Sequence, residues 1–151
     1  MNKQYLVLAA LSLLTFSTLS PGDMRECSDR DWTKTAKYAE ETRLPIIILY
    51  TAPGCAYCER LKDEVLKPMF GKQEQLALVR EVDINSGGKM TDFDGELIRS
   101  RQFKQRYHVF ATPTLLILDS AGRPLRDPIV GYDSKDQYQS RLKKVLAGFQ
   151  I

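Results

Sequence analysis

The sequence predicts an α/β fold in which helices flank a mixed central sheet, with an added β-hairpin. The near-continuous apolar run at residues 46–50 is typical of a strand that is buried on both faces. Helical patterns stand before and after this run, and a second apolar run occupies residues 114–118. Such alternation along a chain of 151 residues indicates one domain built as an α/β sandwich.

The first predicted helix carries Trp32 and Ala39 on its apolar face. Ser28 or Asp31 can cap its N-terminus, because either side chain can accept a hydrogen bond from the free backbone N–H groups there. The helix is expected to end before Pro45, since a proline disfavours the helical conformation of the residue that precedes it.

A second helix is expected after the strand at residues 46–50. Leu61 and Val65 have helical spacing within it. Pro68 is expected to end or kink this helix, because proline lacks a backbone N–H and its ring clashes with the preceding turn. Residues 78–84 then predict a second strand, with charged residues interleaved among the apolar ones.

A hairpin is predicted over residues 90–98, because Asp94-Gly95 at its centre favours a tight turn. Ser100 is expected to cap a short helix whose Phe103 faces inward.

The last third of the chain predicts two strands and a closing helix. The strand at residues 114–118 ends at a turn over 119–122, and a short strand follows at 128–131. Ser134 and Gln137 have the spacing of a capping box, which predicts the start of the final helix.

Residues 1–22 are expected to be a cleavable signal peptide, which leaves residues 23–151 as the domain. Lys3 gives a positive start, residues 5–16 are mostly apolar, and residues 17–22 are small and polar. The apolar stretch is shorter than the about 20 residues that span a bilayer. An uncleaved anchor remains the alternative, since no Ala-x-Ala cleavage site is visible.

Charge and composition exclude some classes of partner. The formal net charge of +3 is too small to predict binding to nucleic acid or to an anionic membrane surface. A hydrophobic content of 43% suits a globular domain. An exported chain would place its cysteines in a compartment where disulfides persist.

Cys55 and Cys58 form a C-x-x-C between the strand at 46–50 and the following helix. The free N–H groups and the positive dipole end of that helix would stabilise a thiolate on Cys55. Cys58, one turn inside the helix, would resolve a mixed disulfide. Strand, C-x-x-C and helix in this order are typical of a dithiol that exchanges disulfides with other proteins.

The cysteines allow two other interpretations. A purely structural disulfide would close a loop too short to stabilise the fold much. A zinc site could draw on Cys27, Cys55, Cys58 and His108, but Cys27 and His108 are each isolated in the sequence, whereas structural zinc usually uses paired ligands. Cys27 is therefore expected to be an idle thiol, with an intermolecular disulfide as the alternative.

Two separated segments, residues 55–58 and 107–114, resemble the signatures of the thioredoxin superfamily, and the resemblance covers nearly all of residues 29–149. It implies a thioredoxin fold with Pro113 as a cis-proline beside the dithiol. The cis form of a bond before proline costs only about 0.5–1 kcal/mol relative to trans, so a fold can hold it. It also implies that the backbone of Thr112 pairs with a bound substrate strand.

Leu49 and Tyr57 are two positions near the cysteines that bear on the chemistry of the dithiol. Typical thioredoxins keep a buried aspartate six positions before the first cysteine, where this chain has Leu49. It therefore lacks that proton acceptor, and water or a group such as Glu59 would have to replace it. Tyr57 lies between the cysteines and is expected to contribute, with Thr112 and Pro113, to substrate binding; a mere packing role is the alternative.

The segment at residues 91–95 resembles the added hairpin of periplasmic SoxW-like thioredoxins. The resemblance implies a periplasmic protein. We also expect it to be a monomer that uses no cofactor and no metal. It would reduce disulfides of other exported proteins and draw electrons from a membrane thiol relay. A disulfide oxidase or isomerase is the alternative enzyme, and a non-catalytic module that binds extended peptides is the alternative from another class.

Overall fold

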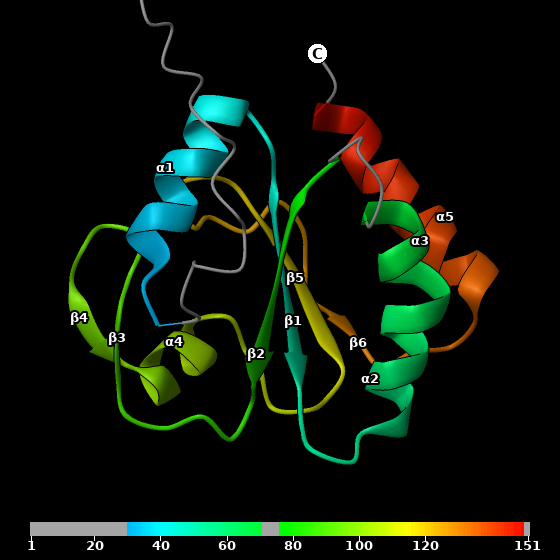
Figure 1. Cartoon of the computed structure of the whole chain (residues 1–151), viewed down its shortest axis with the longest axis horizontal. Helices are drawn as coiled ribbons and strands as arrows, with labels where there is room; N and C mark the ends of the chain where they lie inside the picture. Colours follow the sequence, from blue (N-terminus) through cyan, green and yellow to red (C-terminus); the bar gives the residue numbers. More distant parts are fainter. Residues whose placement is uncertain (1–29, 71–75, 150–151) are drawn as a thin grey trace, which may run out of the picture.

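A four-stranded mixed sheet forms the centre of the protein in the computed structural model, which describes residues 30–70 and 76–149 (Figure 1). The strand order is β2-β1-β5-β6, with β1 parallel to β2 and antiparallel to β5. The predicted mixed sheet is therefore confirmed, while the proposed signal segment and Cys27 lie outside the described residues. The strands are β1 (Ile46–Thr51), β2 (Leu78–Asp83), β5 (Thr114–Leu118) and β6 (Ile129–Val130).

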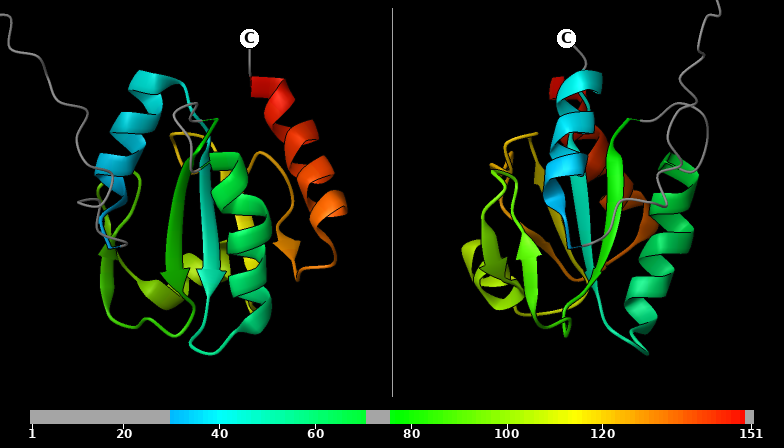
Figure 2. Two further views of the ribbon diagram at one scale, coloured as in Figure 1. Left: turned by 45° about the vertical axis from the view of Figure 1, so that its right-hand side comes forward. Right: turned by 60° about the vertical axis from the view of Figure 1, so that its left-hand side comes forward.

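Helices cover both faces of this sheet. One face carries α1 (Trp32–Thr42) and α4 (Ser100–Arg106), together with a hairpin of β3 (Lys89–Thr91) and β4 (Leu97–Arg99). The other carries one long helix and the C-terminal helix, and Figure 2 shows these on the side away from the hairpin. The long helix consists of α2 (Ala56–Leu61), a π-helical segment η2 (Lys62–Leu66) and α3 (Lys67–Phe70); the C-terminal helix is α5 (Lys135–Leu146), followed by the 3₁₀ turn η3 (Ala147–Phe149).

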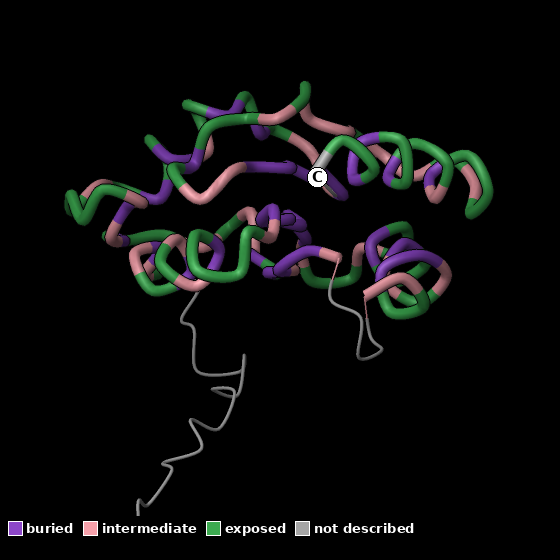
Figure 3. Tube along the Cα trace, turned by 90° about the horizontal axis from the view of Figure 1, so that it is seen from above, coloured by how far each residue is buried: buried purple, intermediate pink, exposed green. Residues whose placement is uncertain are grey.

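Strand β1 divides the core into two halves. Ile46, Ile48 and Tyr50 pack under α1 and α4, whereas Ile47 and Leu49 pack under α2 and α5. Every residue of β1 is buried, as its continuous apolar pattern predicted. Figure 3 shows the buried residues gathered along the central strands and on the inward sides of the helices.

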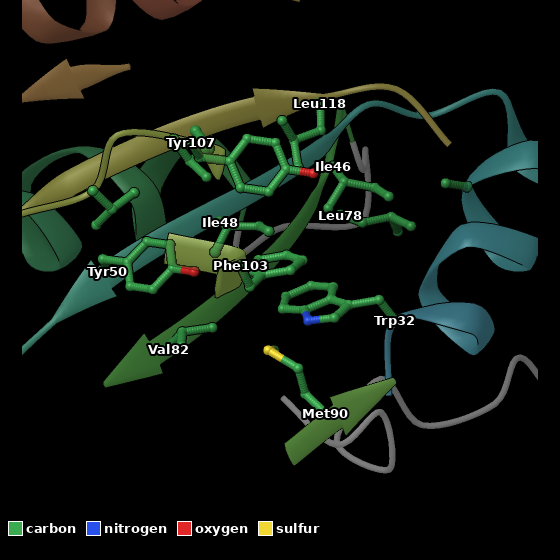
Figure 4. Packing of buried hydrophobic residues seen from close by; sticks show 13 residues of the cluster. Trp32, Ile46, Ile48, Tyr50, Leu78, Val82, Met90, Phe103, Tyr107 and Leu118 are labelled. Carbon is green, nitrogen blue, oxygen red and sulfur yellow. The ribbon is translucent and has the colours of Figure 1, made fainter. Parts of the chain in front are cut away.

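Stacked aromatic rings attach the hairpin to the core. The Trp32 ring lies 5.5 Å from both Phe93 and Phe103. Tyr107 meets the Phe103 ring edge-on at 5.0 Å, and Figure 4 shows Trp32, Phe103 and Tyr107 in the core. The predicted core positions of Trp32 and Phe103 are confirmed, since neither has any exposed surface. The hairpin backbone adds a bond from the Thr91 N–H to the Arg30 carbonyl at 2.7 Å.

The helix starts agree only in part with the sequence. Asp31 caps α1 by accepting the Thr33 N–H at 3.1 Å, as expected. Ser100, however, is the first residue of α4 and not its cap, because its hydroxyl turns to the carbonyls of the preceding glycine pair. Ser134 does precede α5, but its side chain makes no capping bond, so the predicted capping box is wrong.

Pro68 does not end the long helix, which continues to Phe70. Directly before it, the Lys67 N–H bonds to the Lys62 carbonyl and so widens the turn into a π-helix. Such a bulge is one way for a helix to accept a proline, whose ring would otherwise press on the carbonyl four residues back.

A partly buried ion pair joins α4 to the hairpin. An Arg106 guanidinium nitrogen lies 2.5 Å from Asp92 Oδ2, and the Asp92 side chain is 2% exposed against 48% for Arg106. We expect Arg106→Leu to lower the free energy of unfolding by about 3 kcal/mol, because it leaves a buried carboxylate without its counter-charge. Asp92→Asn is expected to cost about 1 kcal/mol, because the remaining guanidinium reaches water.

Urea unfolding of both single variants and of the double variant measures this asymmetry. The double variant is expected to be more stable than Arg106→Leu alone, since it contains no buried charge. Equal losses for the two single variants would contradict the argument.

Candidate functional site

Cys55 and Cys58 lie where β1 passes into the long helix. Strand β1 ends at Thr51, the Cys55 N–H bonds to the Ala52 carbonyl at 3.2 Å, and Cys55 is the N-cap of α2. The turn passes through Gly54 in the left-handed region, at φ 73°, which glycine adopts without strain. The two cysteines form a disulfide with their Cα atoms 5.3 Å apart. The structure thus places both predicted residues together.

The two sulfur atoms stand in unequal surroundings. Cys55 is partly exposed, whereas Cys58 has no exposed surface. The Cys58 backbone N–H donates to Cys55 Sγ at 3.2 Å. In the reduced protein this donor, together with the dipole of the helix, would stabilise a thiolate on Cys55. The arrangement therefore offers one accessible nucleophile and one sheltered partner.

The predicted proline lies at the same end of the sheet. Thr114, the next residue, pairs with Tyr50 near the end of β1, and the Thr112–Pro113 bond is cis. Pro113 is buried and its carbonyl accepts the Gly131 N–H at 2.8 Å, while Thr112 is partly exposed. The cis form expected from the resemblance is confirmed.

Three large apolar side chains are exposed around this end. Tyr57 is 58% exposed, Phe110 79% and Val130 50%. Tyr57 lies between the cysteines, Phe110 leads into the cis-proline, and Val130 pairs with Thr114. The sequence singled out Tyr57 but neither of the others. Phe110 could have been identified as a candidate contact residue because it is a large apolar residue three positions before Pro113.

A polar cluster ties the long helix to the loop after β6. Arg60 Nε lies 3.0 Å from Glu64 Oε1, the Tyr132 hydroxyl donates to Glu64 Oε2, and the guanidinium lies 5.3 Å from the Tyr132 ring centre. The hydrogen bonds from Tyr132 and Arg60 lower the pKa of Glu64. Desolvation, followed by the contact with Glu64, raises the pKa of Tyr132 to about 12. At neutral pH the carboxylate is charged and the phenol is neutral, so the cluster persists.

No acid replaces the missing aspartate at its own position. Leu49 is buried in the apolar cluster beneath the long helix. Glu59, the substitute considered from the sequence, has a side chain that is 63% exposed and pairs with Lys62 at 2.7 Å. The Glu59 carboxylate therefore lies at the surface, where it pairs with a lysine of the same long helix. Neither Leu49 nor Glu59 is therefore placed to accept the Cys58 proton.

Within residues 30–70 and 76–149, no three His, Cys, Asp or Glu side chains gather as a metal site. His108 is exposed, with its backbone in the left-handed region at φ 52°. Cys27 lies outside the described residues. The same part of the chain contains no helix long and apolar enough to cross a membrane.

A family model described as a thioredoxin-like domain matches residues 32–146 of this chain. Among solved structures, a thioredoxin-fold protein from Helicobacter pylori is 21% identical, with a TM-score of 0.56 over 72% of this chain and 73% of that one. Trxlp from Edwardsiella tarda is 21% identical, with a TM-score of 0.53 over 77% and 94%. A DsbH oxidoreductase is 18% identical, with a TM-score of 0.51 over 74% and 78%. No curated protein matches the sequence. The structural likenesses support the fold.

Proposed function

The chain belongs to the thioredoxin-like domain family, and on this basis we propose that it is an exported thiol–disulfide oxidoreductase that reduces disulfides of other proteins. One observation carries the proposal: a C-x-x-C pair at a helix start, with Cys55 partly exposed and Cys58 buried. A dithiol so arranged can attack a partner and then release it.

The reaction takes two exchanges. The Cys55 thiolate attacks one sulfur of the substrate disulfide, and the other substrate sulfur leaves as a thiolate. The Cys58 thiolate then attacks Cys55 Sγ, the Cys55–substrate bond breaks, and the second substrate thiolate leaves. The substrate gains two electrons, Cys55 and Cys58 end as a disulfide, and an external donor must reduce them again.

Substrate would bind as an extended strand along Thr112, beside Pro113. Tyr57, Phe110 and Val130 give this end of the sheet apolar contacts that tolerate different sequences. Backbone pairing supplies affinity in this mode of recognition, and side-chain contacts supply selectivity.

We further place the protein in the periplasm as a SoxW-like monomer, with residues 1–22 as its signal peptide. The support for this placement is that residues 91–95, which resemble the added hairpin of that branch in sequence, lie in and beside the hairpin of β3 and β4. The periplasm is kept oxidising, so a reductant there needs a donor, for which we propose a membrane thiol relay.

Turnover of insulin disulfides tests the activity. The mature protein is expected to accelerate insulin precipitation with dithiothreitol as donor, because each cycle returns the Cys55–Cys58 pair to the reduced state. Bovine insulin with dithiothreitol alone is the control. A rate equal to that control would favour the non-catalytic binding module.

The reduction potential decides the direction. Equilibration with glutathione is expected to give a value near that of thioredoxin, about −270 mV, whereas about −120 mV would mark an oxidant. Thiol trapping in intact cells, with and without the relay, then checks the donor. Full oxidation of both cysteines in both strains would contradict the reducing role.

A further inference from the structure

Cys58 must lose its proton before it can resolve the mixed disulfide, because only a thiolate attacks a disulfide sulfur. Its side chain has no contact with solvent, which removes bulk water as a ready acceptor. Leu49 cannot take a proton, and Glu59 faces outward. The sheet beneath the helix offers a further candidate.

Glu81 is the carboxylate that the sheet brings to this place. It pairs with Leu49 across the parallel ladder of β1 and β2, and paired residues in such a ladder point to the same face. That face is the one under the long helix, since Leu49 packs there with Leu61. Lys62 of the helix confirms the direction, because its Nζ lies 3.0 Å from Glu81 Oε1. The Glu81 side chain is 48% exposed, so it reaches solvent as well as the buried Thr51 hydroxyl on this face.

A buried hydroxyl on the same face of the sheet bonds to this carboxylate. Thr51 Oγ1 donates to Glu81 Oε1 at 3.2 Å, and Thr51 is only 7% exposed. Thr51 follows Leu49 by two residues, so it shares the face under the helix. The long helix runs antiparallel to β1 (Figure 1). Cys58 precedes Leu61 by about one turn of this helix and is therefore nearer the Thr51 end of the strand.

We propose that Glu81 accepts the Cys58 proton through the Thr51 hydroxyl, an inference that rests on the proposed function. In the resolving step Thr51 passes its proton to Glu81 and takes the proton of Cys58. The Cys58 thiolate attacks Cys55 Sγ, and the electron pair of the broken bond leaves with the substrate thiolate. Glu81 then returns its proton to solvent.

The Lys62 ammonium has two carboxylate partners. Lys62 bonds Glu59 as well as Glu81, so it keeps an anionic partner when Glu81 is protonated. Burial acts to lower the pKa of Lys62, but its hydrogen bonds to the two glutamates outweigh burial and raise that pKa, so the ammonium stays charged. Lys67 lines the same cavity of about 250 Å³ as Glu81, and Asp83 follows two residues along β2.

The test separates attack by Cys55 from resolution by Cys58. The reduced protein, in a Cys27→Ser background, is mixed with 5,5′-dithiobis(2-nitrobenzoate) in a stopped-flow instrument. The first thionitrobenzoate is released when Cys55 attacks and the second when Cys58 resolves. Glu81→Gln is expected to slow the second phase about 10- to 100-fold at about pH 6, and less at higher pH, where hydroxide replaces the acceptor. The first phase is expected to stay unchanged.

Two matched variants separate proton acceptance from a structural role. Glu59→Gln removes the other partner of Lys62 and is expected to leave the second phase unchanged. Thr51→Val removes the hydroxyl and is expected to slow that phase as Glu81→Gln does. Thr51→Ser keeps the hydroxyl and is expected to retain the wild-type rate. An unchanged second phase in Glu81→Gln, or an equal loss in Glu59→Gln, would overturn the proposal. Because the probe is a small disulfide, the result does not depend on whether the wild-type protein reduces insulin.

Discussion

Cys55→Ser is expected to abolish reduction of protein disulfides, and Cys58→Ser to stop the reaction at a mixed disulfide. The reason is the unequal exposure of the two sulfurs: Cys55 can meet a substrate, whereas Cys58 has no exposed surface. Without the Cys58 thiol, the Cys55–substrate bond has no internal nucleophile to break it. Insulin turnover measures the first effect, and non-reducing electrophoresis of Cys58→Ser with a substrate protein measures the second.

The third cysteine provides the control for both variants. Cys27→Ser retains the C-x-x-C pair and is expected to keep full turnover. The assignment of roles would be reversed if alkylation of the reduced protein at about pH 6 modified Cys58 faster than Cys55, since the more ionised and accessible thiol reacts first.

The sequence predicted most of the fold because each main element has a local pattern. Strand β1 is a run of apolar residues, and Asp94-Gly95 lies in the turn of the hairpin, where the Gly95 N–H bonds to the Asp92 carbonyl. The error at Ser100 concerns competition between hydrogen-bond partners. The Ser100 hydroxyl could cap α4, but carbonyls of a preceding loop accept its hydrogen bond instead.

The residues of the site also differ in whether a local sequence pattern predicts them. Cys55, Cys58 and Pro113 could be predicted because contiguous motifs contain them. The contact between Thr51 and Glu81 joins residues 30 positions apart and depends on the register of β1 with β2. The Tyr132–Glu64 hydrogen bond spans 68 positions. No pattern within one segment encodes such contacts, so the structure was needed to find them.

Gly122→Ala is expected to destabilise the fold by about 3 kcal/mol, because the added methyl group meets both backbone strain and a close contact. Gly122 has φ 75°, and a Cβ there would lie 2.3 Å from Cδ2 of Phe93. The Phe93 ring cannot easily move away, because it stacks on Trp32 and Phe103. The Gly122 backbone is held as well, since its carbonyl accepts the Tyr107 hydroxyl at 2.7 Å.

Gly95→Ala separates the two causes of this loss. Gly95 has φ 88°, but a Cβ there would meet nothing closer than Thr33 Cγ2 at 3.9 Å. It is therefore expected to cost only the about 1 kcal/mol of a left-handed alanine. Urea unfolding of the two variants gives the difference, which measures how firmly Phe93 locks the hairpin onto the turn between β5 and β6. If both variants lose the same free energy, the ring yields freely and the hairpin is not fixed by this contact.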